Sequence, residues 1–143
     1  MKKILKLIVP LLATLVLLTA CSGEKTKEFI KNSDGHEIKA TLYYKGDVVN
    51  KSVTIDTIID NKYNLTVDFV KQALQYNIKN ISGYTYNVED KNGKITVTYV
   101  IDYNNLDFDK AKSALTIPEN SLEEARKLST ITKRITENGF KEK

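Results

Sequence analysis

The residue best suited to chemical reaction is the single cysteine of the chain, Cys21. It follows Leu18, Thr19 and Ala20, an aliphatic residue and two small ones that let a peptidase approach the main chain. A thiol can act as a catalytic nucleophile or accept a lipid, and catalysis requires a base beside it. The chain offers one histidine, His36, as such a base. A single cysteine also excludes an internal disulfide.

The residues before Cys21 have the composition of a secretory signal. Three lysines lie near the start, no acidic residue is present, and an apolar run covers residues 7–18. That run is short for a membrane-spanning helix, which needs about 20 predominantly apolar residues. We therefore predict a signal peptide over residues 1–20. An uncleaved N-terminal membrane anchor is the alternative.

Residues 18–21 resemble the bacterial lipobox. The resemblance implies transfer of a diacylglyceryl group to the Cys21 sulfur, cleavage between Ala20 and Cys21, and acyl chains such as palmitate on the mature N-terminus. Two acyl chains anchor a protein stably, whereas one holds it weakly. We therefore expect a lipoprotein at the cell membrane that faces outside the cytoplasm.

Most of the positive charge belongs to the leader. The whole chain carries a net charge of +4, with 22 Lys and Arg against 18 Asp and Glu. Removal of the three leader lysines leaves a net charge of +1. Without a block rich in Lys and Arg the mature chain lacks the electrostatic pattern of a nucleic-acid binder. We expect no nucleic-acid partner.

His36 follows a predicted turn at Asp34-Gly35, which favours a solvated residue at a strand end over a catalytic base. With Asp34 and Glu37 it provides one imidazole and two carboxylates on a single loop tip. Zinc sites normally draw three or four ligands from a converging scaffold. We therefore predict no metal site and no cofactor.

Asp102, Asp107 and Asp109 are carboxylates close together in the sequence. Paired carboxylates can perform acid–base catalysis, but an aspartate at a helix start ordinarily caps the helix. We interpret Asp107 as a cap and predict a binding domain that is not an enzyme. A small envelope hydrolase using carboxylates near Asp102 and Asp107 remains an alternative, as does an accessory solute-binding lipoprotein.

Tyrosine is the one residue type whose number is unusual, with eight in the chain. Four can share one sheet face: Tyr84, Tyr86, Tyr99 and Tyr103. Tyrosine is amphipathic and common at recognition surfaces. These residues are either part of the core, with their hydroxyls reaching the edge of the core, or an aromatic patch that binds a peptide, a glycan or an envelope protein.

The elements that position these residues follow from turn signals and alternating apolar residues. Turns at Asp34-Gly35 and Gly46-Asp47 predict a three-stranded antiparallel meander over about residues 27–59. The second turn predicts the pairs Tyr44–Val49, Ala40–Val53 and Ile38–Ile55, and the first places Phe29 opposite Ala40. A hairpin at Asn92-Gly93 predicts the pairs Val88–Val97, Tyr86–Tyr99 and Tyr84–Ile101.

Three helices are predicted from caps and apolar spacing. Thr66 caps a helix to about Asn80, and Asp107 begins a short one. Ser121 begins a third helix that ends at Gly139. The chain is thus expected to be a single α+β domain over residues 29–143, after a tether over residues 21–28. Its antiparallel sheet combines the meander and the hairpin and carries helices on one face, in the order three strands, a helix, two strands and two helices.

Several turns and strand ends carry a further resemblance. The lipobox is followed by Tyr44-Lys45-Gly46-Asp47, Gly83-Tyr84-Thr85-Tyr86, residues 101–107 (IDYNNLD) and Gly139-Phe140-Lys141. Together they resemble the YehR-like family of small bacterial lipoproteins. The resemblance implies an anchored single-domain α+β lipoprotein. Because the family has no assigned activity, it supplies no catalytic residues.

Overall fold

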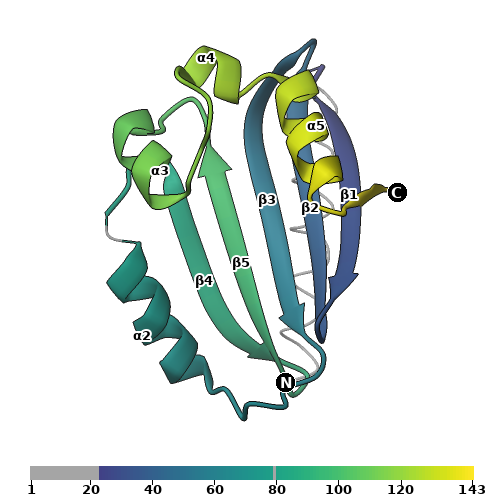
Figure 1. Cartoon of the computed structure of the whole chain (residues 1–143), viewed down its shortest axis with the longest axis vertical. Helices are drawn as coiled ribbons and strands as arrows, with labels where there is room; N and C mark the ends of the chain where they lie inside the picture. Colours follow the sequence, from purple (N-terminus) through teal and green to yellow (C-terminus); the bar gives the residue numbers. More distant parts are fainter. Residues whose placement is uncertain (1–22, 79) are drawn as a thin grey trace, which may run out of the picture.

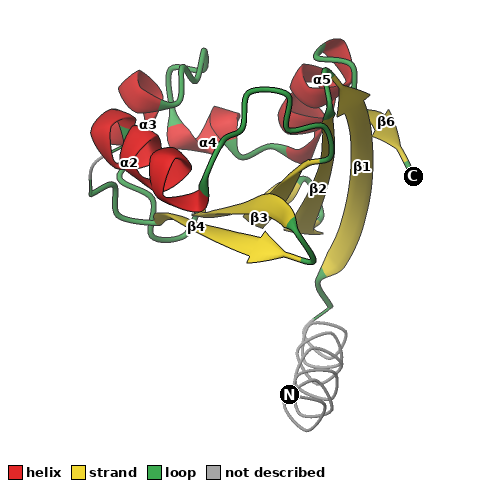
Figure 2. Cartoon of the chain, turned by 90° about the horizontal axis from the view of Figure 1, so that it is seen from below, coloured by secondary structure: helices red, strands yellow, loops and turns green. Residues whose placement is uncertain are grey.

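One antiparallel sheet forms the body of the molecule, with the strand order β4-β5-β3-β2-β1-β6, and the helices lie on one of its faces (Figures 1 and 2). The structure is a computed structural model that describes residues 23–78 and 80–143. The strands are β1 (Lys25–Ser33), β2 (His36–Lys45), β3 (Val48–Ile58), β4 (Tyr84–Lys91), β5 (Lys94–Asp102) and β6 (Lys141–Glu142). The helices are α2 (Val67–Asn77), α3 (Phe108–Ala114), α4 (Leu122–Ala125) and α5 (Leu128–Glu137). The predicted α+β fold is confirmed.

Two of the three predicted hairpin registers are confirmed. Phe29 lies opposite Ala40 in the β1–β2 pair. In the β4–β5 pair the observed partners include Val88–Val97, Tyr86–Tyr99 and Tyr84–Ile101. Asn92 and Gly93 both have positive φ, 56° and 78°, as a type I′ turn requires.

The predicted register of the β2–β3 pair is wrong beyond its turn. Tyr44 pairs with Val49 as expected, but a β-bulge between Tyr43 and Tyr44 shifts the register. The pairs that follow are Leu42–Ser52, Ala40–Thr54 and Ile38–Asp56. A bulge inserts one residue into one strand, and a shift of one residue exchanges the two faces of that strand. Alternation on each strand separately does not reveal such an insertion.

The bulge places polar residues of β3 on the helix side of the sheet. Ser52, Thr54 and Asp56 face the helices, while Val53 and Ile55 face the opposite side, where Ile55 is 36% exposed. The central strand therefore presents a polar strip to the side where an apolar one was expected.

The first two helices begin at the predicted caps. The Thr66 hydroxyl accepts a hydrogen bond from the Phe69 main-chain N–H (3.2 Å), and α2 follows. The Asp107 carboxylate accepts one from the Lys110 N–H (3.2 Å) at the start of α3. Short polar side chains at these positions satisfy N–H groups that have no partner within the helix.

The predicted third helix is two helices instead of one. Ser121 caps α4 as expected, but the chain then leaves the helix. The Arg126 carbonyl accepts a hydrogen bond from the Val49 N–H (2.9 Å), and the Leu128 N–H donates to the Asp47 carbonyl (3.0 Å). These contacts with the β2–β3 hairpin interrupt the helix. They come from residues far away in the sequence.

The two ends of the domain also join the sheet. β1 begins at Lys25, within the predicted tether 21–28. Phe140 packs against the core, and β6 then pairs with β1, with Glu142 opposite Phe29. This short last strand was not predicted. It pairs with the middle of β1, at Phe29 and Ile30.

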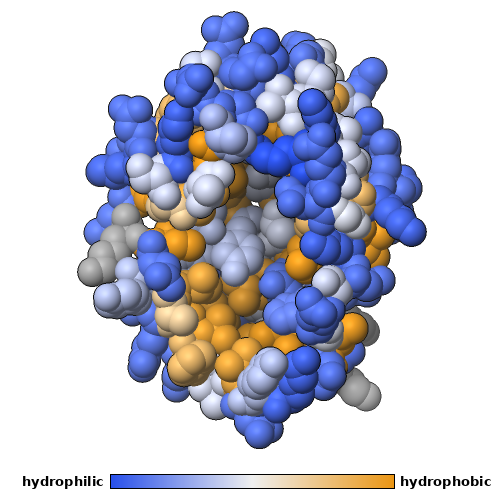
Figure 3. Space-filling model, in the orientation of Figure 1, coloured by the Kyte–Doolittle hydropathy of each residue, from blue (hydrophilic) through white to orange (hydrophobic). Residues whose placement is uncertain are grey.

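The core is divided into two clusters. The first core cluster lies beneath α3 and α5 and comprises Phe29, Ala40, Leu42, Val49, Ile81, Tyr103, Leu106, Ala111 and Ile131. The second comprises Ile58, Val88, Ile95 and Val97, and α2 packs against it through Val67, Val70 and Leu74. Between α2 and α3 on one side and α4 and α5 on the other, the molecular surface is hollowed, with apolar side chains at the base (Figure 3). Among the described residues no helix combines the length and hydropathy that crossing a bilayer requires.

Candidate ligand-binding groove beside strand β4

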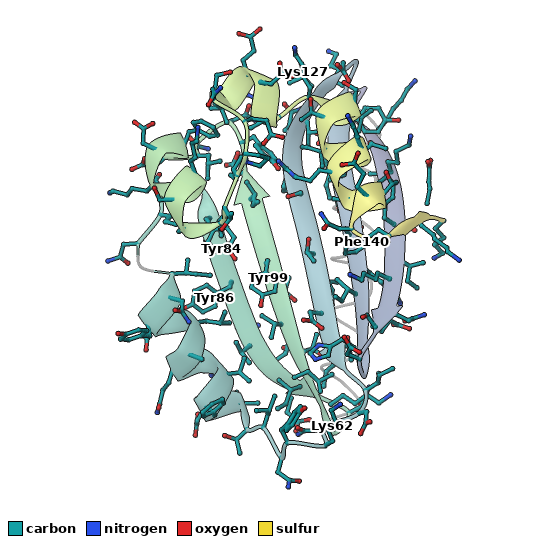
Figure 4. All side chains as sticks on the ribbon, in the orientation of Figure 1. Lys62, Tyr84, Tyr86, Tyr99, Lys127 and Phe140 are labelled. Carbon is teal, nitrogen blue, oxygen red and sulfur yellow. The ribbon has the colours of Figure 1, made fainter. Side chains whose placement is uncertain are left out.

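Three of the four tyrosines proposed as a binding surface lie together. Tyr84, Tyr86 and Tyr99 are half-buried on the helix side of β4 and β5 (Figure 4). Tyr86 and Tyr99 are direct cross-strand partners. The rings of Tyr84 and Tyr99 stack, with centroids 6.4 Å apart and planes inclined by 26°. The register of one hairpin is sufficient to bring these residues together.

Tyr103 is separate from this cluster, and its predicted place on a binding surface is wrong. It is 4% exposed and belongs to the first core cluster. Its main-chain N–H donates to the Asn50 carbonyl (2.9 Å), which turns the chain inward over β3 after β5 ends. Burial raises the pKa of the Tyr103 hydroxyl, and a hydrogen bond with Ser52 partly opposes that rise.

Tyr84 and Tyr99 are neutral hydrogen-bonding groups. Burial raises the pKa of Tyr84 well above its ordinary value, and the neighbouring Tyr99 and Tyr86 add to the rise. Burial also raises the pKa of Tyr99, with a contribution from the Asp56 carboxylate. These hydroxyls therefore stay protonated at physiological pH. They can donate hydrogen bonds to a ligand without carrying charge.

Tyr84 and Tyr86 line a groove of about 800 Å³ between β4, α2 and the loop that joins them. From α2 the groove receives Gln72, Gln75 and Tyr76, and Tyr76 is 81% exposed. The described lining residues are glutamine, asparagine, threonine, tyrosine and isoleucine, all uncharged. Volumes of about 300–1,000 Å³ are usual for ligand sites, whose linings combine mostly apolar and aromatic side chains with a few polar groups.

A smaller pocket of about 220 Å³ continues along the same strand. It lies between Tyr86, Asn87 and Val88 of β4 and Lys71 and Gln75 of α2. Gln75 and Tyr86 line both spaces. The groove therefore follows β4 over several residues and is not confined to one side chain.

His36 and Asp56 form a pair that the sequence did not indicate. The His36 Nδ1 lies 2.8 Å from an Asp56 carboxylate oxygen, and their side chains are 35% and 22% exposed. The expectation of a solvated histidine at a strand end is therefore incomplete, because the residue is half-buried and paired. The bulge in the β2–β3 pair turns Asp56 toward His36, so prediction of this pair required the correct register.

The aspartates considered for catalysis have local roles. The Asp102 carboxylate accepts hydrogen bonds from the Asn104 N–H (3.0 Å) and the Asn105 side chain (2.6 Å), while Asp107 caps α3. Glu37 pairs with Lys39 (3.3 Å). Within the part of the chain that the structure describes, no group of three or more potential ligands is placed to hold a metal ion. Ala20 and Cys21, the proposed cleavage and lipidation residues, lie outside the described residues.

Comparison with known proteins identifies a family and a fold. Residues 25–141 match the family described as protein of unknown function, DUF1307. The NMR structure of the E. coli YehR protein is similar over 83% of this chain and 90% of that one, with a TM-score of 0.67 and 24% identity. The NMR structure of a protein from Streptococcus pneumoniae TIGR4 is similar over 84% of this chain and 85% of that one, with a TM-score of 0.55 and 18% identity.

A curated protein shares a shorter stretch. Probable polyketide synthase 14 of Dictyostelium discoideum is 38% identical over 65 residues, which are 46% of this chain and 2% of that protein. The match therefore spans a small fraction of the length of the synthase. At these identities the two NMR structures establish the α+β fold alone.

Proposed function

This chain belongs to the DUF1307 family of unknown function, and we propose that it is a lipid-anchored binding domain on the extracytoplasmic side of the cell membrane, without catalytic activity of its own. The observation that carries the binding role is the groove beside β4. Its volume of about 800 Å³, the uncharged side chains of its described lining residues and its two tyrosines from β4 suit the capture of a ligand. The Tyr84 ring, which stacks on Tyr99, and its protonated hydroxyl offer contacts to a ligand.

The anchoring role is supported by the sequence around Cys21 and by the position of the first strand. Since β1 begins at Lys25, residues 21–24 separate the proposed lipid from the sheet. Four extended residues span about 13 Å. A domain anchored in this way lies close to the lipid surface, where its groove is available to other envelope components.

The binding role is tested by photo-crosslinking in living cells. A photoreactive p-benzoylphenylalanine at Gln75, on the rim of the groove, is expected to give a discrete adduct with a partner. The same residue at Lys39, which is exposed on the side of the sheet away from the helices, is the matched control. Equal adduct patterns from the two positions contradict the proposal.

The anchoring role is tested with Cys21→Ala. Without the thiol no thioether can form, so we expect the variant to lose labelling by a palmitate analogue and to leave the membrane fraction or accumulate as the precursor. The protein detected by immunoblot in washed membranes is the measurement. Normal processing and full retention of the variant contradict lipidation at this residue.

A further inference from the structure

We propose that the groove beside β4 binds an extended segment of a partner protein, which pairs with the outer edge of β4 as an additional strand and places an uncharged side chain opposite Tyr86. The inference rests on the proposed binding role and names the class of partner. Extended peptides bind sheet edges in this way in several protein families, with main-chain hydrogen bonds that give affinity and alternate side chains that give specificity.

The two edges of the sheet differ. β6 pairs with Phe29 and Ile30 of β1 at one edge, whereas β4 ends the sheet at the other, and no further strand pairs with it in the described part of the chain. β4 has eight residues and no proline, and its pairing with β5 is continuous. Proteins usually protect a regular edge of this length with charged side chains, proline, bulges or a covering element, and β4 carries charged side chains only at its end, over residues 89–91.

Hydrogen bonds already present fix which residues of β4 direct their main chain outward. The Asp102 N–H donates to the Gly83 carbonyl (2.7 Å), so Gly83 faces β5. The next residue, Tyr84, donates its N–H to the Ile81 carbonyl (3.1 Å), away from β5. Orientation alternates along an antiparallel strand, so the N–H and C=O of Tyr86 and Val88 also point outward.

The type I′ turn gives the same alternation independently. In a two-residue hairpin the residues that flank the turn, Lys91 and Lys94, exchange main-chain hydrogen bonds. Residues at every second position before Lys91 also face β5, so Val88 and Tyr86, which lie at the positions between them, face outward. No turn, loop or cap hydrogen bond reaches the main chain of either residue within the described ranges. A paired peptide would form about four hydrogen bonds with them.

α2 lies along this edge on the helix side of the sheet (Figures 1 and 2). Its residues Gln75 and Tyr76 line the groove opposite β4. Side chains of a paired peptide alternate between the two sides of the sheet, so those opposite Tyr86 and Val88 would enter the groove below α2. The described lining beside Tyr86 is uncharged and favours an apolar, aromatic or amide side chain there, whereas Lys71 lines the smaller pocket beside Val88.

α2 also favours a single peptide segment over a second copy of this chain. Two copies paired through β4 would bring two α2 helices to the same edge, each beside the strand of the other. A single flexible peptide segment brings no second helix to this edge and needs only the space beside β4. Self-association through β4 is therefore an outcome that overturns the proposal.

The probes are peptides of about nine residues, long enough to run beside β4. They are selected from a random phage-displayed library against the full chain in nanodiscs, with binding measured by fluorescence anisotropy. We expect binders with an uncharged residue at the position opposite Tyr86. Peptide N-methylation should weaken binding by about tenfold or more at every second residue, where the N–H faces β4, and have little effect at the residues between.

A matched pair of variants tests the same contact from the protein side. Tyr86→Pro and Tyr86→Ala both remove the ring, but only proline also removes the outward N–H. Proline is tolerated where an edge-strand N–H faces solvent, and circular dichroism of both variants checks the fold. The proline variant should bind the peptide about five- to tenfold more weakly than the alanine variant.

The outcomes separate this inference from the proposed function. Strand pairing is overturned by any one of four results. They are equal affinity of the two Tyr86 variants, N-methylation effects without a two-residue period, failure to select any peptide whose binding depends on the groove, and dimerisation through β4. If the Gln75 crosslinks persist in that case, the groove still binds a partner and the binding role stands. If the crosslinks are also absent, both proposals fail.

Discussion

Gly83 occupies a position that other residues cannot take without strain. It has a φ of +80° just before β4, and a Cβ at this residue would lie 2.6 Å from the Leu106 Cα and 2.7 Å from the Asp102 carbonyl oxygen. These are main-chain atoms, which cannot rotate away as the end of a flexible side chain can. The loop that enters the groove strand therefore depends on glycine here.

We expect Gly83→Ala to lower the free energy of unfolding by about 3–5 kcal/mol, because it combines positive φ with main-chain overlap. Urea denaturation followed by circular dichroism is the measurement. Gly46→Ala is the matched control, since Gly46 has a φ of +60° but open space around it. That control should cost about 1–2 kcal/mol. Equal losses for the two variants contradict the steric argument.

The helix break between α4 and α5 shows how one side chain joins separate elements. The Arg126 Nε donates to the Val49 carbonyl (3.0 Å). Its Nη2 donates to the side-chain oxygens of Asn50 (3.0 Å) and Asn104 (2.9 Å). The guanidinium thus connects the start of α5 to β3 and to the turn after β5.

Arg126→Lys is expected to destabilise the domain by about 1–3 kcal/mol, measured by chemical denaturation. The ammonium of lysine is a compact donor that cannot contact all three acceptors in the planar arrangement of arginine. Lys127→Ala is the control, because Lys127 pairs only with Glu124 at the exposed surface among the described residues (2.7 Å). A loss from the control as large as that from Arg126→Lys would contradict this account.

The β2–β3 bulge is the element with the widest consequences. By exchanging the faces of β3 it places Asp56 beside His36 and exposes Ile55 on the opposite side. Bulges are common where a strand must redirect a side chain. The polar strip on the helix side of β3 thus follows from one inserted residue.

At the scale of the whole molecule, the two core clusters are unequally covered. α5 buries Ile131 in the first cluster and α3 buries Ala111. α2, all of whose residues the structure describes, buries none and contacts the second cluster through half-buried side chains. The wall of the groove is therefore held by less burial than the helices over the first cluster.

We expect the main-chain amides of α2 to exchange hydrogen for deuterium faster than those of α5, since local opening is easier where few apolar groups are buried. Hydrogen exchange followed by mass spectrometry is the measurement. A peptide bound beside β4 should slow the exchange in α2 while α5 serves as the internal reference. Equal or greater protection of α2 in the free protein would contradict this interpretation.

The sequence alone determined the features that depend on neighbouring residues. Thr66, Asp107 and Ser121 identified helix starts because a cap is a local hydrogen bond. Asn92-Gly93 fixed the β4–β5 register because a two-residue turn sets the pairing of a hairpin that has no bulge, whereas the β2–β3 hairpin has one. Since side chains on a strand alternate, that register brought the tyrosines of β4 and β5 together.

The tertiary structure decided the features that depend on distant segments. The β2–β3 bulge, the break at Arg126 and the pairing of β6 with β1 all arise from contacts between parts of the chain far apart in the sequence. The groove belongs to the same class, because it exists only where α2 lies beside the outer edge of β4. Local propensity specifies strands and caps, but the free energy of packing chooses which surfaces meet, and that choice forms the site.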